Sequence, residues 1–205
     1  MEELASNDIF SNQQDGAIVN AETIAEPGDA GVAEVIFQVA RMRLMDVNQW
    51  HHLAGNSLAH FQLTDQHGNI IDGPVSEGCH FRINIPGPGT QQGGGFDWVQ
   101  VERVVEYAHQ NTKGVAIQVR PSSNPLTKSD ITAHFYSGQS TSIFAVSINN
   151  RRVTASVYDK NLKPNNDSDK AVDLIRNAVI GTVGILGLSK LQWQRLTDGL
   201  LEQSK

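Results

Sequence analysis

Between residues 60 and 158 the chain is a series of short segments in which apolar and polar residues alternate, with turn-forming residues between them. Alternation with this period is typical of strands that bury one face. The clearest example is Cys79, Phe81, Ile83 and Ile85, which alternate with polar residues until Pro86 ends the segment. We predict strands at residues 60–65, 79–85, 98–108, 115–120, 131–136, 142–148 and 151–158.

The last two predicted strands form a hairpin whose register can also be predicted. Asn149-Asn150 is a two-residue loop suited to positive φ, and such a loop sets the register of its strands. The register aligns Ile148 with Arg151, Val146 with Val153, and Phe144 with Ala155. One face then carries Phe144, Val146, Val153, Ala155 and Val157. A slip by one residue would divide these side chains between two faces.

After Pro164 the apolar period becomes helical. A broad stripe is formed by Val172, Ile175, Val179, Val183 and Leu186. We expect Gly187 to end this helix and residues 189–192 to begin another as a capping box. The second helix would carry Trp193, Leu196 and Leu200 on one side.

A run of strands followed by a long helix indicates the α+β class. We predict a curved antiparallel sheet of about six to eight strands packed on a long C-terminal helix. The order of elements over residues 32–186 resembles that of the helix-grip (START-like) ligand-binding folds, and the resemblance rests on element order alone. It implies a concave sheet that holds the helix around a ligand pocket.

Residues 32–54 fit two patterns. Alternation favours a strand at 32–41, followed by a short helix at 47–54 with Asp46 as its N-cap and Gly55 as its stop. The alternative is one long helix from 31 to 54. We adopt the strand and the short helix as the prediction.

The first 30 residues contain seven acids and no Lys or Arg. They also contain few large apolar residues, so we predict a disordered acidic segment followed by a single domain at 31–205. The alternative is a docking arm, in which residues 16–19 or 23–25 add a strand to the edge of a sheet.

The formal net charge is −6, and no cluster of Lys and Arg is present, which argues against nucleic-acid binding. The longest apolar run, residues 178–188, is too short to cross a bilayer. A single cysteine excludes an intramolecular disulfide. With no leader peptide visible, we expect a cytoplasmic protein without a membrane span.

Seven histidines are present, but their spacing matches no metal-binding motif. His51 and His52 are adjacent, so on a helix they point in different directions. Cys79 lies on the apolar phase of its strand, where a thiol is usually inert. We therefore expect no metal and no cofactor, and the catalytic residues, if any, stay unassigned.

The segment from Pro86 to Trp98 is rich in glycine but lacks the lysine of a phosphate-binding loop. It is either a mobile hairpin connection or a flexible lip over a pocket. In the second case Phe96, Asp97 and Trp98 would stand at the rigid end of the lip as ligand-binding residues.

Arg103 shares the phase of Val101 and Val105. On a regular strand it would point toward the core and would need an internal acid or an anionic ligand, because an unpaired buried charge is very costly. The alternative is a bulge near Glu102 that turns Arg103 outward. Arg82 and His80 are further candidate polar groups of the same pocket.

These features favour a non-enzymatic module that binds a small apolar or amphiphilic molecule. An alternative is a structural or assembly subunit, including a homo-oligomer, that makes contacts through strand edges, the acidic segment or the Trp193 helix. The binding module rests on fold-level analogy. An enzyme that uses the same pocket, with His80, Arg82 or Arg103 as polar groups, is the less favoured hypothesis, because nothing in the sequence raises it above the others.

Overall fold

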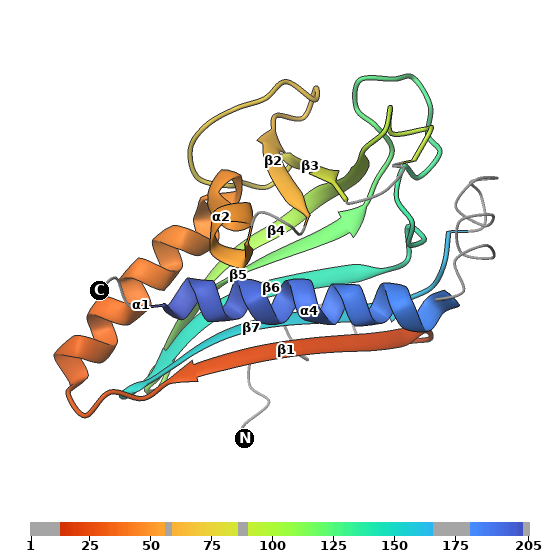
Figure 1. Ribbon diagram of the computed structural model, residues 1–205. Coiled ribbons are helices and arrows are strands. Elements are labelled where there is room, and N and C mark those ends of the chain that lie inside the picture. Colours follow the sequence, from red (N-terminus) through yellow and green to blue (C-terminus); the bar gives the residue numbers. More distant parts are fainter. Residues whose placement is uncertain (1–12, 56–58, 86–89, 166–180, 203–205) are drawn as a thin grey trace.

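Seven antiparallel strands form one sheet in the computed structural model, which describes residues 13–55, 59–85, 90–165 and 181–202. The strands are β1 (Ala17–Ala25), β2 (His60–Thr64), β3 (His80–Asn84), β4 (Asp97–His109), β5 (Thr112–Pro121), β6 (Thr141–Asn149) and β7 (Arg152–Leu162). Their order is β1-β7-β6-β5-β4-β3-β2, so only β1 lies beside a strand that is distant in sequence (Figure 1).

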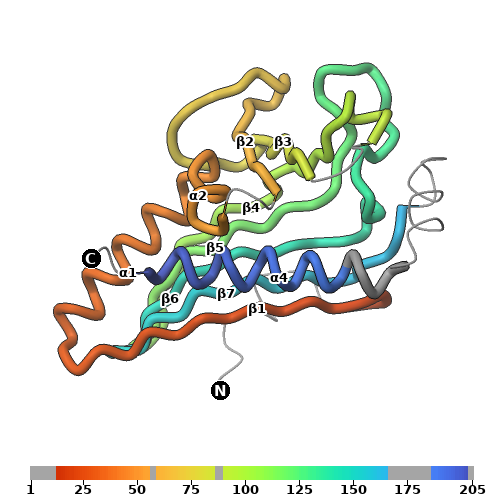
Figure 2. The backbone as a smooth tube through the Cα atoms, in the orientation of Figure 1, coloured from red at the N-terminus to blue at the C-terminus, as the bar shows by residue number. Residues whose placement is uncertain are grey.

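The helices cover one face of this sheet, which we call the inner face. They are α1 (Ala30–Met45), the 3₁₀ turn η1 (Val47–Gln49), α2 (Trp50–Ala54) and α4 (Gly181–Leu201). The sheet curves around α4, which runs along β1 and packs on β7 and α2 (Figures 1 and 2). The predicted α+β architecture, a curved antiparallel sheet with a long C-terminal helix, is confirmed.

An aromatic cluster fills the inner face where α1 meets α2. The Trp50 ring centroid lies 5.5 Å from that of Phe61, 5.6 Å from that of Phe81 and 4.7 Å from that of Phe144. Trp193 of α4 reaches the same group, 5.1 Å from Phe144. Strands from both halves of the sheet therefore share one core with all the helices.

The prediction of a strand at 32–41 is wrong, because this segment is part of α1. Asp29 begins the helix by accepting a hydrogen bond from the Val32 backbone at 3.0 Å. The helical period then places one set of side chains in the core: Ala33, Ile36, Phe37, Ala40 and Leu44. Val35 and Val39, which with Phe37 suggested the alternation, lie outside this set, and Val35 is 63% exposed.

The short helix predicted at 47–54 is present as η1 followed by α2. Asp46, the predicted N-cap, makes no side-chain capping bond. Gly55 follows α2 with φ +101°, a conformation that favours glycine, and so ends the helix as predicted.

The hairpin of β6 and β7 is present, but its register differs from the predicted one by two residues. Ile148 pairs with Val153 and Phe144 with Val157, so the loop is Asn150-Arg151. Asn150 alone of these two has a positive φ, +54°. A shift of two residues keeps every side chain on its face, so the predicted apolar face is correct although its partners are not.

Residues 131–136 do not form the predicted strand. Their backbone instead bonds to two separate segments: Ala133 accepts from Trp98 and donates to Ser122. The segment makes only an isolated bridge, Tyr136 to Pro164. A side chain also replaces a ladder bond, because His134 Nδ1 accepts from the Tyr136 backbone at 2.9 Å.

The C-terminal helix continues through Gly187 and Ser189, so the predicted break between two helices is wrong. Leu196 and Leu200 are buried, as predicted for one side of this helix. The part of the predicted stripe at 172–180 lies outside the described residues. No helix in the described ranges is long and apolar enough to span a membrane.

The predicted disorder of the first 30 residues does not hold for 17–25, which form β1 along β7. The alternative of an added edge strand describes this segment correctly. Val19 and Ala21 are buried beneath α4 and contribute to the inner face. The first 30 residues contain few large apolar side chains, but these two are buried, and their burial stabilises the pairing of β1 with the sheet.

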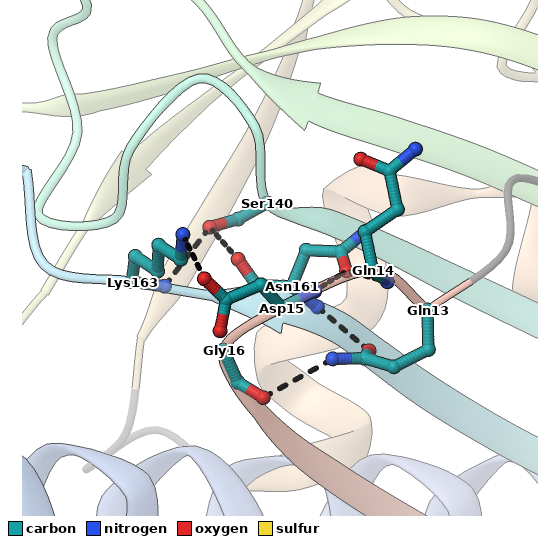
Figure 3. Close-up of polar contacts among 7 residues, drawn as sticks. All are labelled: Gln13, Gln14, Asp15, Gly16, Ser140, Asn161 and Lys163. Atoms are coloured by element: carbon teal, nitrogen blue, oxygen red, sulfur yellow. Dashed lines mark hydrogen bonds and ion pairs between the residues drawn. The ribbon is translucent and has the colours of Figure 1, made fainter.

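Polar contacts hold the start of β1 on the end of β7 (Figure 3). Asn161 Oδ1 accepts from the Gln14 backbone at 2.7 Å and from the Asp15 backbone at 3.2 Å, while Asp15 pairs with Lys163 at 2.6 Å. Gly16 has φ +108°, and a Cβ there would lie 2.8 Å from the Asn161 carbonyl carbon. We call these residues (Gln14, Asp15, Gly16, Asn161 and Lys163) the N-terminal latch.

Deletion of residues 1–25 should therefore destabilise the fold. It removes β1 and the latch, and the burial of Val19 alone is worth about 1.5–3 kcal/mol. We expect the melting temperature to fall by about 10 °C or more. Deletion of residues 1–12 is the control, because it removes none of these contacts. Equal melting temperatures for the two truncated proteins would contradict a structural role for β1.

Candidate functional site

Arg103, the first candidate, lies on the outer face of the sheet and is exposed. The pairing of β4 with β5 shifts between Val101 and Arg103, which marks a bulge at Glu102. After this bulge Val104 packs against the core and Val105 lies in the small outer-face cluster. Arg103 thus does not face the core, and the alternative of a bulge is correct.

Three of the other candidates lie together on the outer face. Arg82 and Trp98 are paired residues of β3 and β4, and the Arg82 guanidinium lies 4.5 Å from the centre of the Phe96 ring. Trp98 is buried, and its Nε1 donates to the Gly93 carbonyl at 3.1 Å. Arg82 also donates to Gln62. These contacts are internal to the protein and fix the turn before β4.

Asp97 is buried and holds that turn in place. Burial raises the pKa of its carboxyl to about 7, against hydrogen bonds from the Phe135 backbone and from Thr90. Thr90 also donates to the Phe96 carbonyl at 2.7 Å. Residues 90–96 are therefore a bonded turn, whereas residues 86–89 of the predicted lip lie outside the described residues.

His80, the last candidate, is buried on β3, at the opposite end of the β3–β4 ladder from Asp97. Burial lowers the pKa of its imidazole, although Asp65 opposes the shift. The other notable histidines form a stack: the His51 ring centroid lies 3.9 Å from those of His52 and His60. No group of three or more potential metal ligands occurs in the described part of the chain.

The most unusual polar group is one that the sequence reasoning missed, Asp159. It lies on β7 in the same phase as Ala155 and Val157, and therefore on the inner face. Only 1% of it is exposed. Its Oδ2 accepts from Trp193 Nε1 at 2.6 Å, which ties β7 to α4. Its Oδ1 makes no hydrogen bond of good geometry with the described residues, although the Ser142 hydroxyl is near enough to lower the pKa of the carboxyl.

Burial raises the pKa of Asp159 to about 6, and hydrogen bonding by the Ser142 and Trp193 side chains opposes this shift only in part. Burial also raises the pKa of the Tyr136 hydroxyl to about 12, and the nearby Asp159 charge adds to the effect. Ser142 lies directly opposite Asp159 on β6. The loss of water around the carboxyl thus outweighs its polar neighbours and favours its neutral form.

A buried carboxyl whose second oxygen lacks a well-formed hydrogen bond, and which makes no ion pair with the described residues, is a candidate functional group. We call Asp159, Ser142, Tyr136, Ser189 and Trp193 the Asp159 cluster. Tyr136 Oη lies 3.4 Å from Ser189 Oγ. Ser189 and Trp193 both belong to α4, so this helix contributes two side chains to the cluster. As an acceptor in an apolar setting, the cluster can orient a donor group of a bound molecule.

The sequence contains a signal for this site. Arg103 draws attention because a charged residue shares the phase of the apolar residues on its strand. Asp159 shows the same pattern, since it shares the phase of Ala155 and Val157. The predicted strand ends at Tyr158, one residue before the acid, and so places Asp159 in the following loop.

A separate surface groove of about 550 Å³ lies between β1, α2 and α4. Its lining residues are Thr23, Ile24, Ala25, His52, Leu53, Ala54, Gly55, Arg195, Asp198, Gly199, Leu201 and Glu202. Thr23 and Asp198 bond to each other across it at 2.6 Å. This polar contact makes the groove a weaker candidate than the Asp159 cluster.

No protein-family model matches the chain, and no curated protein is significantly similar to it. Among solved structures, it is similar to a crystal structure of a hypothetical protein from Helicobacter pylori, with 15% identity and a TM-score of 0.47. The match covers 90% of this chain and 86% of that chain. At this identity and TM-score the likeness assigns neither a family nor a function.

Because Arg103 is exposed on the outer face, Arg103→Met should change the free energy of unfolding by no more than about 0.5 kcal/mol. Arg120→Met is the comparison, since Arg120 pairs with Glu102 at 2.6 Å and donates to the Gly138 carbonyl at 3.1 Å. We expect it to cost about 1–2 kcal/mol. Urea unfolding measures both, and a large loss for the Arg103 variant would show that it has a structural role.

Asp159→Asn should become more stable than the wild type as the pH rises. The folded state holds the Asp159 proton more tightly than the unfolded chain, so ionisation costs the wild type stability between its ordinary pKa of 3.8 and about 6. The amide keeps an acceptor for Trp193 and does not ionise. The advantage of the variant should grow by about 2–3 kcal/mol between pH 4 and pH 8. A difference that is independent of pH would contradict the raised pKa.

Proposed function

We propose that this protein binds a small apolar or amphiphilic molecule on the inner face of its sheet, with the polar end of the molecule at the Asp159 cluster. The observation that carries the proposal is a carboxyl that is 1% exposed and whose Oδ1 makes no hydrogen bond of good geometry with the described residues. Burying such a group costs free energy, and a ligand that donates to it would offset that cost.

The surroundings of the carboxyl support an amphiphilic ligand. Val19, Tyr136 and Leu162 form a small apolar cluster with Trp193 at this end of the sheet. Ser142 is only half-buried, although it lies on the inner face opposite Asp159. By contrast, the aromatic cluster around Trp50 fills the other end. The space for a ligand is therefore expected between Ser142 and α4.

Ser142→Leu should block this space. The neutral fluorophore N-phenyl-1-naphthylamine is a suitable probe, because its emission rises in an apolar site. We expect the wild type to bind it and Ser142→Leu to bind it at least tenfold more weakly, a loss of about 1.4 kcal/mol. Ser147→Leu, a half-buried serine on the outer face of the same strand, is the matched control and should retain binding.

Thermal unfolding of both variants shows whether either substitution has damaged the fold. The proposal is wrong if the wild type does not bind the probe, or if two stable variants bind it equally well.

A further inference from the structure

Asp159 takes part in none of the ion pairs found within the described residues. Those pairs join Arg41 to Glu106, Lys113 to Glu34, Arg120 to Glu102 and Lys163 to Asp15. Asp159 is nevertheless more deeply buried than any of these acids. A buried carboxylate without a cation is strongly disfavoured unless a bound group supplies the opposite charge.

The single bond from Trp193 does not explain why this residue is an acid. That bond uses Oδ2 and needs one neutral acceptor, which asparagine would supply without the cost of a buried charge. Oδ1 makes no contribution to it. The ionisable group therefore provides something beyond the attachment of α4 to β7.

The neighbours of Asp159 suit a small cation. An ammonium group has three N–H donors, so it can satisfy Oδ1 and still donate to the Ser142 hydroxyl. Trp193 and Tyr136 both border the carboxyl, as the bond to Trp193 and the electrostatic effect on Tyr136 show, so their rings can pack beside the apolar chain attached to the ammonium group. A ligand carboxylate would be repelled, and an alcohol would bring no charge.

From this arrangement we propose that the polar end of the ligand is a protonated amine that forms an ion pair with Asp159. This inference rests on the proposed function, since it names the head group of the molecule bound at the same site. The amine would carry an apolar chain toward the side chains of Val19 and Leu162.

The experiment is a displacement series with bound N-phenyl-1-naphthylamine at pH 7.5, using octylamine, octanol and octanoate. The three competitors share one chain and differ in head group. For the wild type we expect octylamine to displace the probe at a concentration at least tenfold lower than octanol, and octanoate to be the weakest. For Asp159→Asn the readout is the ratio of the octanol to the octylamine concentration needed for displacement, which we expect to fall at least tenfold from the wild-type ratio, whatever the affinity of the variant for the probe.

The outcomes separate the two proposals. If the wild type binds the probe but octylamine competes no better than octanol, the amine inference is overturned and the proposed function stands. An amine preference that persists in Asp159→Asn also overturns it, because the charge then acts elsewhere. If the wild type does not bind the probe, the proposed function is wrong, and the amine inference, which rests on it, is overturned as well. Ser147→Leu serves as the control and should retain the wild-type order of the competitors.

Discussion

The indole of Trp50 joins the end of α1 to strands from both halves of the sheet. Its ring packs on Phe61, Phe81 and Phe144, and its Nε1 donates to the Arg43 and Leu44 carbonyls at 3.2 and 3.1 Å. These are carbonyls of the last turn of α1, so one side chain both satisfies that helix end and fills the core. The positions of α1 and α2, and through α2 that of α4, depend on this packing.

The fold class could be predicted from the sequence because the period of apolar residues reports which face is buried. The same period does not report which residues pair, since a shift of two residues in the β6–β7 hairpin leaves every face unchanged. It also fails where a bulge inverts the phase, as at Glu102 in β4. Val35, Phe37 and Val39 alternate as in a strand, yet the same segment also fits a helix, and the contacts of α1 decide between the two.

The candidate site was harder to predict than the fold. Phe96, Asp97, Trp98 and Arg82 do make unusual contacts, but those contacts serve the turn before β4. Asp159 escaped the prediction because the predicted strand stops one residue before it. Its cost to stability at neutral pH is the kind of local conflict that natural sequences retain at functional sites. The residues around Asp159 stabilise the fold, whereas its buried carboxyl destabilises it, and this contrast indicates that Asp159 has a role other than stability.

The pairing of β1 with β7 has a consequence for how the chain is made. The latch joins positions 147 residues apart, and Thr23 bonds to Thr197 of α4 across 174 residues. Since chains are synthesised from the N-terminus, β1 waits without its partner strand until β7, which ends at Leu162, has been produced. Apolar strand segments in that state tend to associate with one another, and flanking charges discourage this. Glu22 and Glu26 flank Ile24 in this way, so the acids of this segment protect a strand that stays unpaired until β7 has been made.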